Sequence, residues 1–200
     1  MLFVNQLTVI FAGPQGSGKD TQVSLLKTYL EKNDPARPTI HFDAGTALRV
    51  FAAHKGYTQE KVDASLKRGE LQPMFVLADV MSEFFISNIK GDEHLLVSGF
   101  PRREDQQMLF DSAMDFYWCE RPTLLFLSLP EEESLRRLLK RGRNDDTEAG
   151  IRERLRWTQS QTLPVLEKFR TNPKYRYIEI DGNRTIEDIH ADILGKLNLQ

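Results

Sequence analysis

Short runs of apolar residues, rich in β-branched and aromatic side chains, alternate with longer amphipathic stretches along this chain. The runs predict strands at residues 7–12, 39–42, 95–98, 123–129 and 175–180. The stretches at residues 17–30 and 131–140 carry apolar residues at helical spacing, so both predict amphipathic helices. Strands that alternate with helices form βαβ units, in which a parallel sheet lies between helical layers. The pattern therefore predicts a three-layer α/β fold around a five-stranded parallel sheet.

Two stretches depart from this alternation. Residues 56–90 have helical periodicity that is broken at Gly69 and Pro73, which predicts two or three helices without a strand. Residues 140–148 are polar and charged. Ligands of open α/β sheets bind at the carboxyl ends of the strands, so insertions after those ends border the site. We expect the functional residues to lie there.

Composition adds limits to this picture. The 200 residues are 40% hydrophobic and 28% charged, which is typical of one globular domain. The net charge of −2, with both signs interspersed, argues against a nucleic-acid-binding surface. Residues 1–6 lead directly into a strand and no apolar run is long enough to span a membrane, so we expect a cytoplasmic protein. We expect it to be a monomer. The single cysteine, Cys119, excludes an internal disulfide, and no Cys/His cluster predicts zinc.

A phosphate-binding loop follows the first strand. Its residues are Gly13, Pro14, Gln15, Gly16, Ser17, Gly18, Lys19, Asp20 and Thr21, and an amphipathic helix comes next. Glycines allow successive N–H groups to face a phosphate, and the helix N-terminus adds partial positive charge. Asp20 occupies the position of the usual magnesium-binding hydroxyl, which here comes one residue later, at Thr21. A simple tight turn would explain neither the lysine nor the spacing.

Four segments together resemble adenylate kinases and related nucleoside monophosphate kinases of the short-lid type. They are GPQGSGKDTQ at 13–22, DAGTALR at 43–49, SGFPR at 98–102 and RNDD at 143–146, in the order that the family has. The resemblance covers nearly the whole chain. It implies a single P-loop kinase domain over 1–200, with a core of 1–43, 91–139 and 149–200. It also implies a helical acceptor-binding insertion at about 44–90 and a very short lid at about 140–148.

The resemblance also implies roles for the basic residues. The catalytic set is Lys19, Arg102, Arg141, Arg143 and Arg154. Phosphoryl transfer spreads negative charge over the transferring oxygens, and arginine binds phosphate bidentately at any relevant pH. ATP-binding residues are the phosphate loop, Arg137 beside the donor adenine, and Gly182. We assign Arg136 and Lys140 to a solvated helix face. Asp145 and Asp146 either order the lid arginines or, with Thr147, cap a helix.

The predicted acceptor is AMP. By resemblance it is bound by Ala44, Gly45, Arg49, Leu71, Gln72, Gly99, Arg102, Gln106, Arg143 and Arg154. Gln106 stands where adenylate kinases use a glutamine to read the adenine edge, and an asparagine there would suggest pyrimidines. Leu71 and Gln72 would offer backbone contacts to the base. An alternative is that Gln106 is an exposed polar residue on a helix, with Gln107 equally able to take the role.

Two departures from the family pattern affect the metal and the lid. Ser98 replaces the usual aspartate that orders the waters of Mg²⁺, so Asp43 or Asp20 is expected to compensate beside Thr21. Ala44 replaces a threonine that contacts the acceptor, and Thr46 is a candidate substitute. Only Gly142 separates Arg141 from Arg143, so we expect a shallow lid and some hydrolysis of ATP by water.

The predicted reaction is reversible, magnesium-dependent transfer from ATP to AMP, giving two molecules of ADP. One alternative is a UMP/CMP kinase or a kinase of broad acceptor specificity, which differs in the pocket around Gln106 and Leu71. A second alternative is a nucleotide-binding regulator with reduced catalysis, suggested by Ser98 and Ala44. The intact set of basic residues argues against the regulator, because their mutual repulsion costs stability without an anion.

Overall fold

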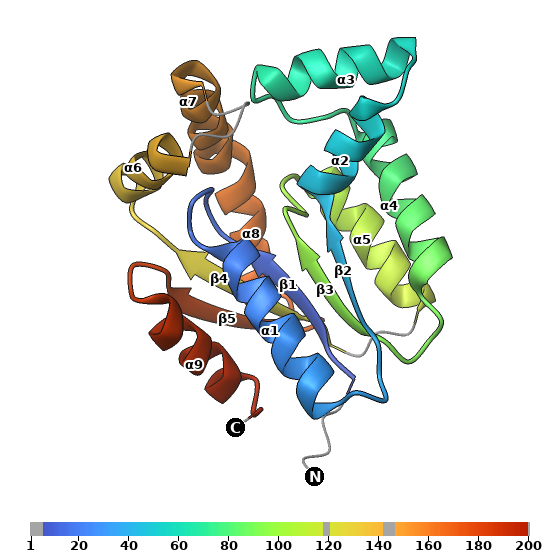
Figure 1. Cartoon of the computed structure of the whole chain (residues 1–200), viewed down its shortest axis with the longest axis vertical. Coiled ribbons are helices and arrows are strands. Elements are labelled where there is room, and N and C mark those ends of the chain that lie inside the picture. Colours follow the sequence, from blue (N-terminus) through green and yellow to red (C-terminus); the bar gives the residue numbers. More distant parts are fainter. Residues whose placement is uncertain (1–5, 118–120, 142–146, 200) are drawn as a thin grey trace.

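A computed structural model describes residues 6–117, 121–141 and 147–199. Five parallel strands form one sheet in the order β2-β3-β1-β4-β5 (Figure 1). The strands are β1 (Thr8–Ala12), β2 (Thr39–Asp43), β3 (His94–Ser98), β4 (Thr123–Ser128) and β5 (Arg176–Asp181). The predicted five-stranded α/β fold is confirmed, and each predicted strand end lies within one residue of the observed one.

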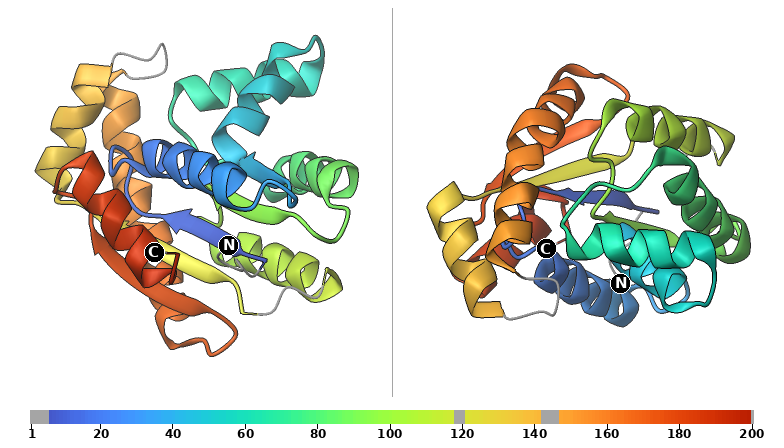
Figure 2. Two further views of the ribbon diagram at one scale, coloured as in Figure 1. Left: turned by 60° about the horizontal axis from the view of Figure 1, so that its bottom comes forward. Right: turned by 90° about the horizontal axis from the view of Figure 1, so that it is seen from above.

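Helices cover both faces of the sheet (Figure 2). On one face, α1 (Lys19–Asn33) and α9 (Ile186–Lys196) pack against Val9 and Phe11 of β1. On the other face, Ile10 and Ala12 pack in a core with α4 (Met74–Asn88), α5 (Glu104–Phe116) and α8 (Leu163–Thr171). Successive strand residues point to opposite faces, so the apolar run from Val9 to Ala12 supplies both cores.

The remaining helices stand at the carboxyl ends of the strands. On one side are α2 (Ala44–Ala53) and α3 (Tyr57–Lys67), and on the other are α6 (Glu131–Arg141) and α7 (Glu148–Trp157) (Figure 1). A π-helix, η1 (Thr158–Thr162), joins α7 directly to α8. The segment predicted as an insertion at 44–90 thus contains three helices, of which α4 packs against β2 and α5 as part of the core layer.

Local signals set where the helices begin. The first helix begins at Lys19 rather than at residue 17, because Gly18 before it has a φ of 91° and caps the helix in a left-handed conformation. The side chain of Asp43 caps α2 by accepting a hydrogen bond from the Thr46 N–H. Thr147 caps α7 in the same way through the Gly150 N–H. Among the residues placed in the structure, no helix is both long and apolar enough to cross a membrane.

Candidate active site

A cavity of about 470 Å³ lies at the carboxyl ends of the strands. Its walls come from the phosphate loop, the start of α2, the α3–α4 loop, the β3–α5 loop, α6 and α7. This volume is in the range of small-molecule sites. Because all five strands are parallel, loops from distant parts of the sequence meet at this one edge of the sheet.

The phosphate loop closes on itself around Lys19. The Lys19 ammonium donates hydrogen bonds to the carbonyl of Gly13 at 2.8 Å, to that of Pro14 at 2.6 Å and to Ser17 Oγ at 3.2 Å. Burial lowers the pKa of Lys19 to about 8, and the positive charges of Arg102 and Arg141 act in the same direction. Lys19 therefore occupies the concave side of the loop where a phosphate would sit.

Gly13 can only be glycine. Its φ is +135°, and a Cβ added there would lie 2.3 Å from the carbonyl oxygen of Leu127 on β4. The loop therefore leaves β1 in contact with the neighbouring strand, which fixes where the rest of the loop begins.

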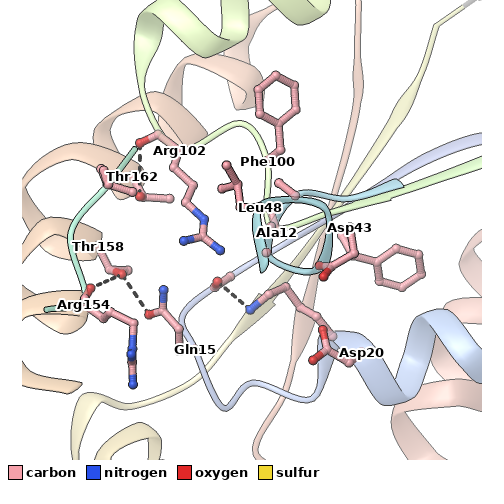
Figure 3. A pocket seen from close by; sticks show the side chains of 18 of the residues that line it. Ala12, Gln15, Asp20, Asp43, Leu48, Phe100, Arg102, Arg154, Thr158 and Thr162 are labelled. Carbon is pink, nitrogen blue, oxygen red and sulfur yellow. Dashed lines mark hydrogen bonds between the residues drawn. The ribbon is translucent and has the colours of Figure 1, made fainter. Parts of the chain in front are cut away.

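The described basic residues of the predicted catalytic set line the same cavity. Among the residues that the structure describes, six basic side chains do so: Lys19, Arg49, Arg102, Arg137, Arg141 and Arg154. In Figure 3 the guanidinium of Arg102 points into the cavity, with Arg154 on one side and Asp43 and Asp20 on the other. Burial lowers the pKa of Arg102 to about 10, which keeps it charged at neutral pH. Arg143, Asp145 and Asp146, with most of the predicted lid, lie outside the described residues.

Three residues, one at the end of α7 and two in the π-helix that follows, contact the arginines, and the sequence did not predict them. The Trp157 ring lies under the Arg102 guanidinium, 5.0 Å from its centre, and the Trp157 indole N–H donates to the Gly69 carbonyl at 2.8 Å. Thr158 Oγ1 lies 2.6 Å from the Arg154 carbonyl and 3.1 Å from Oε1 of Gln15 in the phosphate loop (Figure 3). Thr162 Oγ1 donates to the Arg102 carbonyl at 3.1 Å.

These contacts join the π-helix to both halves of the site. π-Helical turns are rare and recur at functional sites. The sequence around Thr158 and Thr162 has neither a cap nor a periodicity that distinguishes a π-helix from an α-helix. Residues 158–162 are polar throughout, so nothing in the sequence distinguishes Thr158 and Thr162 from their neighbours.

A chain of polar residues connects the ends of β2 and β3. Ser98 Oγ donates to Asp43 Oδ2 at 2.9 Å and lies 2.8 Å from His41 Nε2. A hydroxyl has one proton, so His41 donates to Ser98 in this arrangement. Although burial acts to raise it, the pKa of Asp43 is held below its usual value by hydrogen bonds from Thr46 and Ser98. Ser98 is fully buried and positions Asp43, which itself lines the cavity.

The acceptor side contains most of the residues predicted for it. Lining the cavity are Ala44, Gly45, Arg49, Leu71, Gln72, Gly99 and Gln106. Gln106 is only 3% exposed, so the interpretation as an exposed surface residue is wrong. Gln107 is also buried but does not line the cavity. Thr46 does not line it either, and its hydroxyl accepts a hydrogen bond from Arg49 at 3.0 Å.

Arg137 connects α6 to the donor side. Its guanidinium donates to Glu133 at 2.6 Å, to the Gly16 carbonyl at 3.2 Å and to the Gly182 carbonyl at 3.1 Å. Gly182 thus acts on the cavity through Arg137 and does not line it. Arg136 is exposed and donates to both carboxylate oxygens of Glu133, as predicted for the solvated face of this helix.

Not every predicted residue reaches the cavity wall. Pro14 and Ser17 are buried behind the phosphate loop, while Gly13, Gln15, Gly16, Gly18, Asp20 and Thr21 line the cavity. Pro14 and Ser17 instead contribute a carbonyl and a hydroxyl to the Lys19 ammonium. The loop therefore presents its glycine backbone, Lys19 and the oxygen atoms of Asp20 and Thr21 to one space.

Comparison with known proteins agrees with this geometry. The family model described as "Adenylate kinase" matches residues 11–174. A uridylate kinase of Saccharomyces cerevisiae is 31% identical over 94% of this chain and 90% of its own length. An adenylate kinase of Thermosynechococcus vestitus is 30% identical over 94% of this chain and 95% of its own. UMP-CMP kinase 1 of Oryza sativa subsp. japonica is 30% identical over 98% of this chain and 77% of its own.

The match extends from the end of β1 to the loop before β5, so it includes the phosphate loop, the acceptor side and the arginines of α6 and α7. All three relatives are named as nucleotide kinases, but their names give different acceptors. The chain belongs to the adenylate kinase family of nucleoside monophosphate kinases.

Proposed function

We propose that this chain transfers the γ-phosphoryl group of ATP to AMP, reversibly and with Mg²⁺, to give two molecules of ADP. The observation that carries the proposal is the position of Gln106. It is buried in the wall of the cavity that holds the catalytic arginines, and it contacts Arg102 directly. An amide at this position can both donate and accept, which suits the paired groups of adenine.

The basic residues align the two nucleotides. Lys19 exchanges its loop carbonyl partners for phosphate oxygens when ATP binds, because the charged pairing is the stronger one. Arg49 and Arg102 hold the acceptor phosphate from α2 and the β3–α5 loop, and Arg141 and Arg154 approach the transferring group from α6 and α7. Positive charge fixed before the reaction stabilises the developing negative charge of the transition state at little reorganisation cost.

Residues that line the cavity beside Lys19 suit a magnesium ion. Asp20, Thr21 and Asp43 provide carboxylate and hydroxyl oxygens, which are the ligand types that Mg²⁺ takes together with nucleotide phosphates. The low pKa of Asp43 keeps its carboxylate ionised at neutral pH. When bound, the ion neutralises phosphate charge. We assign Asp43 the role of ordering the waters of the ion, with Ser98 holding Asp43 in place.

The metal assignment has a test that does not require turnover. Binding of Mn²⁺ as a probe for Mg²⁺, measured by electron paramagnetic resonance with ADP present, should weaken roughly tenfold in Asp43→Asn, in line with losses at groups around metal sites. The Mg²⁺ dependence of the rate should shift in parallel. Unchanged Mn²⁺ binding in both Asp43→Asn and Asp20→Asn would refute the assignment.

A second acceptor class is favoured by one observation. Relatives that match this chain over most of its length are named uridylate and UMP-CMP kinases as well as adenylate kinases. A kinase acting on UMP or CMP would use the same arginines and differ in how the base is read. A regulator with reduced catalysis remains the third candidate, and turnover with any monophosphate would exclude it.

One coupled assay tests these alternatives together. With ATP and Mg²⁺ fixed, ADP production is measured with AMP, GMP, CMP, UMP and dTMP in turn. The proposal predicts the highest kcat/KM with AMP. A higher value with UMP would replace adenylate kinase by uridylate kinase, and no turnover with any of the five would support the regulator.

A further inference from the structure

The side chain of Gln72 has one satisfied end and one unsatisfied end. Gln72 lies in the loop between α3 and α4, lines the cavity and is only 4% exposed. Its Nε2 donates to Ser65 Oγ at 3.0 Å and to the Glu70 carbonyl at 3.3 Å. Because a backbone carbonyl can only accept, this contact fixes which end of the amide is nitrogen.

The unsatisfied end of the amide is therefore Oε1 of Gln72. It accepts no hydrogen bond from any residue that the structure describes, and it is shielded from solvent. An amide oxygen buried without a donor is unfavourable and rare in folded proteins. An oxygen of this kind beside a cavity is explained if a ligand N–H supplies the missing donor.

Gln106 presents the opposite group. Its Oε1 accepts the backbone N–H of Arg102 at 2.8 Å, and this N–H can only donate, so the Gln106 amide is also fixed in orientation. Gln106 Nε2 has no acceptor among the residues placed in the structure, and it remains available as a donor. Gln72 and Gln106 line one cavity, and their side chains carry an unused hydrogen-bond acceptor and an unused donor, respectively.

We propose that Gln72 is a second base-reading residue and that, with Gln106, it selects acceptors whose base presents an amino group next to an unprotonated ring nitrogen. Adenine and cytosine each present an amino donor beside a ring-nitrogen acceptor, which complements the Gln72 oxygen and the Gln106 amide nitrogen. Uracil and guanine present a carbonyl acceptor beside an N–H donor, which reverses the pattern. This inference rests on the proposed function. The family resemblance implied only a backbone contact from Gln72 to the base, whereas here the Gln72 side chain contacts the base as well.

The surroundings of the two amides suit a flat base. Leu48, Leu66, Leu77 and Phe100 line the same cavity and offer apolar contact to a ring. In the conformation described here, Oε1 of Gln72 is covered by its neighbours, so the base reaches it by displacing them. Gln72 itself lies in the α3–α4 loop, which is joined to α7 by the Trp157–Gly69 hydrogen bond.

The first test compares acceptors in the full-length wild-type protein and in Gln72→Leu. The wild-type should bind AMP and CMP more tightly than UMP and GMP, as measured by isothermal titration calorimetry without ATP. Gln72→Leu should lose roughly 10- to 100-fold in kcat/KM for AMP, as expected when a buried hydrogen bond to substrate is lost, and change little for UMP. An equal loss for AMP and UMP would show a merely structural role and overturn the proposal.

A modified ligand gives a second test, and its measurement on the wild-type protein does not depend on whether the variant folds. Purine ribonucleoside monophosphate is AMP without the amino group. The wild-type should use it roughly 10- to 100-fold less well than AMP, and Gln72→Leu should use the two about equally, because the variant and the ligand change remove the same contact. If the wild-type does not distinguish the two ligands, the proposal is wrong.

Gln107→Leu is the matched control. Gln107 is buried on α5 beside Gln106 but does not line the cavity, so this variant should keep the wild-type ratio between AMP and purine ribonucleoside monophosphate. A protein that phosphorylates all monophosphates equally would overturn the inference while the kinase assignment stands. A protein that phosphorylates none would overturn the proposed function itself, so the two failures are distinguishable.

Discussion

The Lys19 ammonium should take up a proton when nucleotide binds at alkaline pH. Burial in the phosphate loop lowers its pKa to about 8, so the side chain is already partly neutral above pH 7. Phosphate oxygens arriving beside Lys19 favour the charged form and return the pKa toward its ordinary value. Binding of ADP must therefore be accompanied by proton uptake wherever the unbound protein has lost this proton.

The amount of proton uptake follows from the pKa. A lysine with a pKa of about 8 is about half protonated at pH 8 and about one-tenth protonated at pH 9. If Lys19 is fully protonated in the complex, binding takes up about 0.1 proton per protein molecule at pH 7, about 0.5 at pH 8 and about 0.9 at pH 9. The same linkage weakens ADP binding by roughly tenfold between pH 7 and pH 9.

Isothermal titration calorimetry measures this uptake directly. ADP is titrated at each pH in two buffers that differ in ionisation enthalpy, and the difference in observed heat gives the number of protons transferred. Lys19→Arg is the matched control, because arginine keeps the positive charge and does not titrate in this range. Equal uptake by the wild-type and Lys19→Arg, or no uptake by the wild-type at pH 9, would refute the reasoning.

Three further predictions concern residues that position the site. Gly13→Ala places a Cβ 2.3 Å from a backbone carbonyl of β4 at a φ of +135°, so it should lower the melting temperature and abolish ATP binding by calorimetry. Trp157→Phe leaves the Gly69 carbonyl without its donor, which should lower the free energy of unfolding, measured in urea, by about 1–3 kcal/mol. The variant should also have a KM that rises more for the monophosphate than for ATP. An unchanged ratio of the two KM values would contradict this. The low folded-state pKa of Asp43 contributes stability that is complete above its unfolded pKa of about 4 and is lost as pH falls. Ser98→Ala removes one of the hydrogen bonds that lower this pKa, so the midpoint of acid unfolding, followed by circular dichroism, should move to higher pH. An unmoved midpoint would contradict the role of this hydrogen bond.

The sequence by itself determined the fold class and the donor half of the site. Strand runs such as residues 9–12 are apolar throughout, as is typical of parallel strands buried on both faces, and their alternation with amphipathic helices leaves few topologies. The phosphate loop was equally readable because its function depends on local backbone geometry: glycines, a lysine and the next helix lie within nine positions. Contacts this close in sequence need no tertiary information.

The tertiary structure decided which distant residues act together. Ser98 looked like a loss at the metal site, and only the pairing of β2 with β3 places its hydroxyl against Asp43. The π-helix contacts of Thr158 and the unsatisfied oxygen of Gln72 depend on side-chain orientations that no spacing in the sequence encodes. Sequence patterns report the periodicity of a single element, whereas hydrogen-bond satisfaction is a property of several elements packed together.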